Sequence, residues 1–242
     1  MTEKQYGGST GRETGKVVTN INKDATKSTT NKVRIDKSTS EDKNFSYNKS
    51  SGEEKIIKAG KIASETKKYA ASIIKRGMPL LEIAEKIEAE IEKLGGKPAF
   101  PANLSIDNIA AHYTPSYDDK TIAQGLLKVD IGVSMNGLIA DTAFSIDLEN
   151  NDENKRLIKA SMDALEKALK IVKRDVSTDE IGEIISKTIE SNGFSPIINL
   201  SGHSMNKHEL HSGITIPNIN DKININLKEW LYEIEPFATT GS

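Results

Sequence analysis

The chain has no cysteine among its 242 residues and little excess charge of either sign. The missing cysteines exclude disulfide bonds and thiolate zinc sites, and they fit a reducing compartment. Lysine and arginine total 33 against 35 aspartates and glutamates, so a net charge of −2 gives no indication of nucleic acid or of an acidic membrane surface as a partner. No apolar run reaches the length of a membrane span, and the N-terminus lacks an apolar signal region, so we expect a cytoplasmic protein.

The composition changes near residue 53. Residues 1–52 are rich in Lys, Thr, Ser, Asn and Gly, and their few apolar residues follow no period. They predict a disordered low-complexity tail, because such a segment cannot bury enough surface to offset its chain entropy. From residue 53 the sequence becomes regular, and residues 53–242 are long enough for one domain with a substantial core.

Four helices are expected in this domain. Asn151 is a candidate cap for the third, and Ser177 followed by Glu180 has the spacing of a capping box that opens the fourth. Glycines end the first, second and fourth helical patterns. The expected helices cover residues 56–75, 80–94, 152–173 and 178–192.

The two helical pairs are copies of each other in sequence. Residues 73–98 align with residues 171–196 at a constant offset of 98, and the tripeptide Asn-Leu-Ser at 103–105 recurs at 199–201. A run of matches in register predicts two copies of a helix–helix–sheet unit. We therefore expect an α+β domain with pseudo-twofold symmetry, in which paired half-sheets carry the helices on their outer side.

Two acids interrupt the apolar run KVDIGVSMNGLIADTAF at residues 128–144. The run alternates like a strand, and the Asn-Gly dipeptide at 136–137 predicts a two-residue hairpin turn. Such a turn pairs Gly132 with Asp141 and places Asp130 on the same face, so the two acids are diagonal neighbours about 7–8 Å apart. The missing side chain of Gly132 suggests open space between them.

The hairpin alone leaves two interpretations open. The acids could be solvated on the open face of an edge hairpin, or they could share a buried site in which a bridging divalent cation removes their repulsion. The second unit favours a site, since Glu235 in the predicted strand 231–237 takes the place of Asp130. A return strand carrying a counterpart of Asp141 would lie beyond Ser242, so the chain is expected to be truncated in its second half.

All four histidines lie in the loop-rich second part of each unit: His112, His203, His208 and His211. An isolated buried histidine is more often structural than catalytic, but this clustering beside strand acids favours a functional site. One histidine with several carboxylates suits a hard or borderline divalent ion such as Mn, Fe, Co or Zn.

Four motifs in order resemble those of type 2 methionine aminopeptidases, the archaeal form in particular. They are AFPANLSIDNIAAHYTP (99–115), the hairpin run at 128–144, NLSGHSMNKHELHSG (199–213) and EIEPFATTG (233–241). The resemblance covers residue 53 to the end of the chain. It implies the duplicated pita-bread (creatinase/aminopeptidase) fold and a site for two divalent metal ions, drawn from Co, Mn, Fe or Zn.

The same resemblance implies a metal-binding role for four residues. Asp130 resembles a bidentate ligand, Asp141 the acid that bridges both metals, and His203 and Glu235 two further ligands. The family's fifth ligand is a Glu on a late strand, which would lie beyond the end of this sequence. The expected site therefore holds four of five ligands, and its metal affinity and activity are expected to be lowered.

The remaining roles concern the substrate. His112 and His211 resemble the catalytic histidines that contact substrate and assist the tetrahedral intermediate, and Phe100 resembles an aromatic wall of the methionine pocket. His208 matches no family role, and we expect it to be a solvated loop residue.

The implied function is removal of the initiator methionine from nascent polypeptides that begin with Met and a small second residue. The ribosome is a further candidate partner, a monomer is expected, and no membrane or specific nucleic acid is involved. Two alternatives are a catalytically impaired pita-bread binding protein and a prolidase-like Xaa-Pro peptidase. Retention of the four expected ligands favours an active enzyme over the first.

Overall fold

The computed structural model describes residues 49–241, so the predicted tail lies almost wholly outside the described residues. The first unit consists of α1 (Lys49–Ile73), α2 (Leu80–Lys93), β1 (Lys97–Pro98), β2 (Asn103–Ile106), β3 (Leu126–Met135) and β4 (Leu138–Asp147). The second consists of α3 (Asp152–Ile171), α4 (Thr178–Ser191), β5 (Ser195–Pro196), β6 (Ser201–Met205), β7 (Thr215–Pro217), β8 (Leu231–Tyr232) and β9 (Ala238–Thr239). None of the helices in this range combines the length and apolar character that a bilayer crossing requires.

All four predicted helices are present, and both predicted caps are confirmed. The Asn151 side chain accepts hydrogen bonds from the N–H groups of Glu153 and Asn154, and Ser177 and Glu180 form the complete capping box. These bonds satisfy N–H groups that a helix start would otherwise leave without partners. The first helix differs most from expectation, since α1 begins at Lys49 rather than at residue 56.

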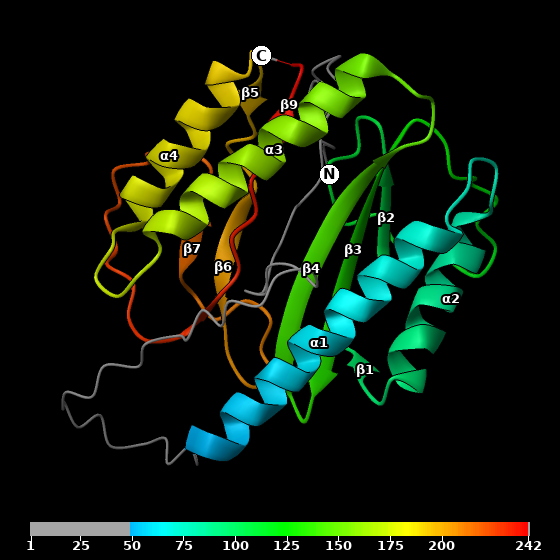
Figure 1. Ribbon diagram of the computed structural model, residues 1–242, viewed down its shortest axis with the longest axis horizontal. Coiled ribbons are helices and arrows are strands. Elements are labelled where there is room, and N and C mark those ends of the chain that lie inside the picture. The colour runs from blue at the N-terminus through cyan, green and yellow to red at the C-terminus, as the bar shows by residue number, and fades with distance from the viewer. Residues whose placement is uncertain (1–48, 242) are drawn as a thin grey trace, which may run out of the picture.

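The backbone pairing confirms the duplication. The helices α2 and α4, like β1 and β5, have bounds that differ by the predicted offset of 98. Equivalent hydrogen bonds recur as well: Leu80 N–H donates to the carbonyl of Thr121, and Thr178 N–H donates to that of Ile225, both at 2.9 Å. The two units therefore share topology as well as sequence pattern, and they lie beside each other in Figure 1.

The hairpin has the predicted register. β3 pairs antiparallel with β4 so that Met135 faces Leu138, Gly132 faces Asp141, and Asp130 faces Ala143. β3 is also bonded to β1 and β2 and so forms the centre of the first sheet. Within residues 49–241 the second unit contains no counterpart of β4.

The predicted continuous strand over residues 231–237 is wrong in detail. β8 ends at Tyr232, and the next strand, β9, begins only at Ala238. Pro236 lies in the gap and has no N–H to donate to a ladder. The segment nevertheless stays bonded to its neighbours, because Glu233 and His203 exchange two backbone hydrogen bonds of 2.8 and 3.2 Å.

The recurrence of Asn-Leu-Ser at 199–201 is not a structural equivalence. In the first unit Ser105 pairs with Lys128, and in the second unit the corresponding pair is His203 with Glu233. The tripeptide at 103–105 therefore corresponds to residues 201–203. The similar residues at 199–201 therefore stand two positions out of register, and only the last of them, Ser201, belongs to β6.

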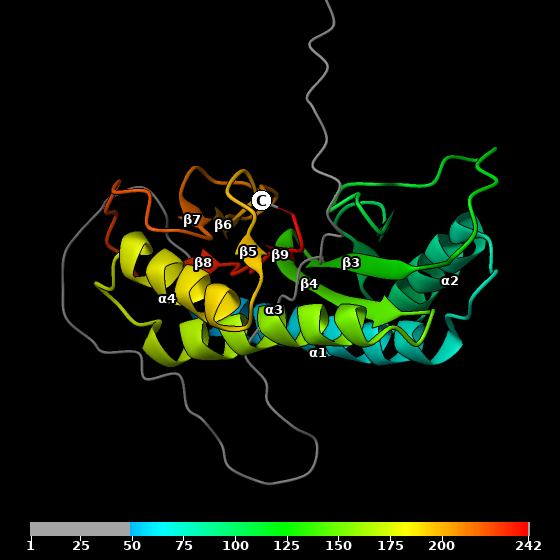
Figure 2. The same ribbon diagram turned by 90° about the horizontal axis from the view of Figure 1, so that it is seen from above.

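Each unit has its own apolar core between helices and strands. In the first, α1 and α2 contribute residues such as Ala63 and Ile87 to a core that also contains Val129 and Ile131 of β3. In the second, α3 and α4 pack over the short strands, and Leu126 of β3 joins this core from the first unit. Figure 2 shows α1 and α3 in one layer and the strands in a second layer beside it. The face of the strands that points away from these two helices is therefore left for the polar side chains described below.

The carboxylate of Asp147 holds the junction between β4 and α3. It accepts hydrogen bonds from Glu149 N–H at 3.1 Å, Asn151 N–H at 2.6 Å and the Asn154 side-chain amide at 3.0 Å. Burial raises the pKa of Asp147, but these bonds outweigh it and leave the pKa below its usual value of 3.8. A lowered folded-state pKa stabilises the protein above pH 3.8, and that contribution disappears as the pH falls through the folded value.

We expect Asp147→Asn to lower the free energy of unfolding by about 1 kcal/mol at pH 7, a small figure because the group is partly exposed. The difference from wild type should be smaller at pH 3, because this pH lies below the ordinary pKa of 3.8 and part of the stabilisation by the ionised carboxylate is then lost. Urea unfolding at both pH values measures it, with Asp118→Asn on an exposed loop as the control. An equal difference at both pH values would contradict the assigned role of the charge.

Candidate metal centre

Asp130 and Asp141 are buried, which excludes the interpretation of two solvated acids on an edge hairpin. Their exposed fractions are 7% and 1%. Both lie on the same face of the β3–β4 hairpin, because Asp141 faces Gly132 and Gly132 follows Asp130 by two residues. Buried carboxylates require a compensating partner or ion, so their position on this face indicates a site.

The expected open space over Gly132 is filled. A Cβ atom at Gly132 would lie 2.3 Å from Cε1 of Phe100 and 2.6 Å from its Cδ1. The glycine is thus required by the close approach of the aromatic ring. Phe100 is thereby brought onto the strand face that carries Asp130 and Asp141, and the pocket wall that the family resemblance implies for this ring stays a prediction.

The second unit contributes one histidine and two acids. His203 Nε2 lies 2.6 Å from Glu233 Oε2 and 3.4 Å from Glu235 Oε1. All three residues are buried, with exposed fractions of 5%, 1% and 6%. The other ring nitrogen, Nδ1, lies 3.4 Å from the carbonyl oxygen of Ser204, which leaves Nε2 as the nitrogen that faces the carboxylates.

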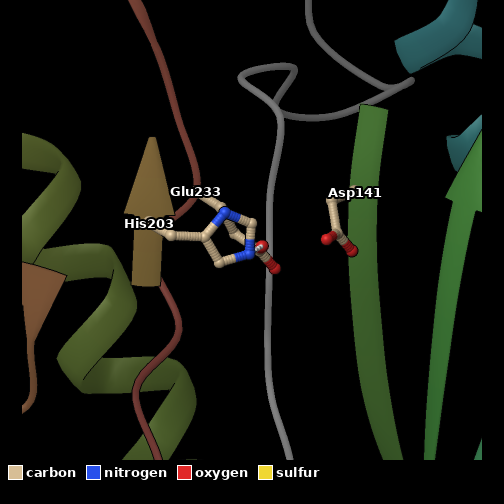
Figure 3. Close-up of side chains that lie close together, drawn as sticks. All are labelled: Asp141, His203 and Glu233. Carbon is tan, nitrogen blue, oxygen red and sulfur yellow. Dashed lines mark ion pairs between the residues drawn. The ribbon is translucent and has the colours of Figure 1, made fainter. Parts of the chain in front are cut away.

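Side chains from the two units converge. One ligand-type atom from each of Asp141, His203 and Glu233 lies within 4.8 Å of the others. Figure 3 shows the His203 and Glu233 side chains extending from one unit towards the Asp141 carboxylate on β4 of the other. Asp130 and Glu235, both predicted ligands, are outside this tightest group, although Glu235 contacts the same histidine nitrogen.

Glu233 was missed by the sequence analysis. The signal was present, because Glu233 and Glu235 alternate with Tyr232 and Ile234 just as the residues of the hairpin alternate. Two acids two residues apart in an extended segment share a face. The family resemblance implies only Glu235 as a ligand in this segment.

The other three histidines are exposed. The His211 ring meets the His203 ring edge to face, with centroids 4.2 Å apart and planes at 84°. His112 adopts a left-handed backbone conformation with φ of 65° on the loop after β2. His208 donates its N–H to the carbonyl of Gly137 at 2.8 Å, and its ring covers that hairpin glycine. His208 is thus an exposed loop residue, as predicted, that contacts the turn of the first unit.

The donor set fits a divalent metal ion. It combines one imidazole with several carboxylates, all nearly excluded from water. Carboxylate oxygen and imidazole nitrogen together suit Mn, Fe, Co or Zn, and a buried cluster of acids is stabilised by a cation. The residues present are therefore chemically suited to hold such an ion.

Known proteins share this sequence pattern. The model of metallopeptidase family M24 matches residues 54–236. The methionine aminopeptidase of Thermococcus onnurineus is 50% identical over 193 residues, which are 77% of this chain and 64% of that protein. The one from Methanothermus fervidus is 48% identical over 175 residues, 67% of this chain and 93% of that sequence. The chain thus spans about 64% of the length of the Thermococcus relative.

Solved structures share the fold. The methionine aminopeptidase of Thermotoga maritima superposes with a TM-score of 0.67 at 24% identity, over 78% of this chain and 90% of that one. The prolidase of Pyrococcus furiosus gives a TM-score of 0.65 at 23% identity, over 78% of this chain and 59% of that one. The predicted α+β, duplicated pita-bread fold is confirmed.

Proposed function

Because the chain belongs to metallopeptidase family M24, we propose that it removes the N-terminal methionine from polypeptides by metal-assisted hydrolysis of the first peptide bond. The observation that supports this most is the convergence of Asp141 from one unit with His203 and Glu233 from the other. The relatives at 43–50% identity carry the name methionine aminopeptidase. Polypeptides with a small second residue are the expected substrates, and contact with the ribosome and a monomeric state are further expectations.

We propose Asp130, Asp141, His203 and Glu235 as the residues that hold two divalent ions. When bound, such ions would polarise a peptide carbonyl and lower the pKa of water towards about 7. The contribution of the protein is to fix the donors in place. Asp141 is held in the middle of a ten-residue strand, and two backbone hydrogen bonds hold His203 against the segment that carries Glu235.

The exposed histidines and the aromatic ring are proposed to act on the substrate. His211 lies against His203 yet is exposed, so it can contact both the buried centre and an entering peptide. His112 is exposed on its loop and is proposed to donate a hydrogen bond to the developing oxyanion. Such a donor is worth roughly 3 kcal/mol. The half-buried ring of Phe100 forms one wall of the methionine pocket.

We expect Gly132→Ala to lower kcat/KM for a methionyl peptide about tenfold with a small loss of stability. The three atoms nearest to the added methyl group all belong to the Phe100 ring, which can rotate away, so displacement of the ring should cost substrate binding more than folding. Steady-state kinetics and thermal unfolding measure the two effects. Phe100→Leu removes the clash and the ring together, and in that background Gly132→Ala should have little further effect.

A cleavage assay tests the proposed function. The full chain, loaded with Mn²⁺ or Co²⁺, is incubated with the peptide Met-Ala-Ser and separately with the dipeptide Ala-Pro. We expect release of methionine from Met-Ala-Ser and no cleavage of Ala-Pro. The matched control is Asp141→Asn, which should release no methionine above background.

Two other outcomes of this assay would indicate a different function. Cleavage of Ala-Pro alone would identify an Xaa-Pro peptidase, which uses the same fold. Metal binding without cleavage of either peptide would identify a catalytically impaired binding protein. Either result would refute the proposal.

A further inference from the structure

Glu233 is a buried acid that the expected ligand set does not include. Its side chain is 0% exposed, less than the 7% of His203 and of Glu235, the two residues it accompanies in the second unit. Its backbone is fixed opposite His203 by two hydrogen bonds. Since an ionised carboxylate inside a protein is stable only beside a cation or strong donors, the position needs a physical explanation.

The fold itself does not require an acid at this position. The equivalent residue of the first unit is Lys128, which pairs with Ser105 as Glu233 pairs with His203. The Lys128 ammonium donates hydrogen bonds to backbone oxygens, at 2.6 Å to the carbonyl of Asp107 and at 3.4 Å to that of Leu126. The two units thus use one backbone position for different purposes, and only the second unit places a carboxylate there.

The carboxylate of Glu233 lies where a metal ligand would lie. Oε2 is 2.6 Å from His203 Nε2, the ring nitrogen that faces the acids, and an atom of Asp141 completes the group within 4.8 Å. If His203 Nε2 binds a metal ion, that nitrogen has no proton left to donate to Glu233. The two atoms could then stay close only if the same cation also attracts the carboxylate.

The surrounding charges also favour a cation at this point. Asp130, Asp141, Glu233 and Glu235 are all buried, and a divalent ion among them offsets the mutual repulsion of their carboxylates.

We propose that Glu233 is itself a metal-binding residue, which adds a carboxylate to the site formed by Asp141 and His203. The inference rests on the proposed function for the presence of a metal, and it deepens that function by naming a further ligand. A residue that only orients His203 and a residue that binds the ion would have different effects. Only loss of a ligand should change both the number of metal ions bound and the absorption spectrum of the bound metal.

The test measures metal binding directly. The full chain is stripped with a chelator and titrated with Mn²⁺, and free Mn²⁺ is counted by electron paramagnetic resonance. Glu233→Gln, which keeps the shape and removes the charge, is compared with wild type and with Glu92→Gln, an exposed position on α2. We expect Glu233→Gln to raise the Kd of at least one Mn²⁺ by about 10–100-fold, and Glu92→Gln to leave it unchanged.

A second readout separates a ligand from a supporting residue. With Co²⁺ in place of Mn²⁺, the visible absorption bands report the number and type of ligands, so Glu233→Gln should change their intensity. If Glu233→Gln does not fold by circular dichroism, Glu233→Asp keeps the charge with a shorter reach and is expected to give an intermediate Kd.

The outcomes distinguish this inference from the function on which it rests. A wild-type chain that binds Mn²⁺, with Glu233→Gln matching its Kd within twofold and its Co²⁺ spectrum, would overturn the inference alone. A wild-type chain that binds neither ion would overturn the proposed function and the inference together.

Discussion

Replacing Asp141 by asparagine is expected to lower kcat/KM for Met-Ala-Ser by about three orders of magnitude while the fold stays intact. Asp141 is the contribution of the first unit to the tightest group of ligand-type atoms. The several kcal/mol that a bound divalent ion supplies should be lost with it, and about 4 kcal/mol corresponds to about 10³-fold in rate. Steady-state kinetics with Mn²⁺ in excess measure the effect.

The same substitution should not destabilise the metal-free protein. Asp141 is 1% exposed and shares its surroundings with other buried acids, so removal of one negative charge relieves repulsion. We expect the free energy of unfolding in a chelator to equal or exceed that of wild type, by up to about 1 kcal/mol. Added Mn²⁺ should then stabilise wild type more than the variant. This pattern is typical of a site that is maintained for function at a cost in stability.

The control for Asp141→Asn is Asp163→Asn on α3. Asp163 pairs with Lys159 one helical turn away, and that lysine is 68% exposed, so the pair is worth only a few tenths of a kcal/mol. Both measured quantities should match those of wild type. Wild-type kcat/KM in Asp141→Asn would show that the acid on β4 takes no part in catalysis.

The hairpin register could be predicted because two local signals agreed. The alternation in β3 fixed which residues share a face, and the Asn-Gly dipeptide fixed the loop length, so Gly132 had to face Asp141. The helix caps followed from equally local chemistry at Asn151 and Ser177. These contacts lie within a few residues of one another along the chain.

The features that the sequence did not reveal depend on distant parts of the chain. The ring that fills the space over Gly132 comes from Phe100, on the segment between β1 and β2. The close pair of His203 and Glu233 depends on the register of β6 with residues beyond β8. The exposed His112 and His211 had roles only through family resemblance, and these roles stay predictions.

Gly202→Ala is expected to be the most destabilising of the substitutions considered. A Cβ atom at Gly202 would lie 2.3 Å from the carbonyl oxygen of Glu233 and 3.1 Å from the Cα atom of Ile234. These are backbone atoms of the paired segment and cannot rotate away, so the segment itself must move. We expect a loss of about 3 kcal/mol in the free energy of unfolding and a fall of roughly 6–12 °C in Tm.

The displacement should also damage the proposed metal centre. The displaced segment carries Glu233 and Glu235, both of which contact His203 Nε2, so Mn²⁺ affinity should fall together with stability. Gly95→Ala is the matched control, because its methyl group meets nothing within 4 Å and its cost, about 1 kcal/mol, comes only from the φ of 86°. It should leave Mn²⁺ affinity unchanged. If Gly202→Ala binds Mn²⁺ as wild type does, the close approach of β6 to the acid-bearing segment does not hold the ligands in place.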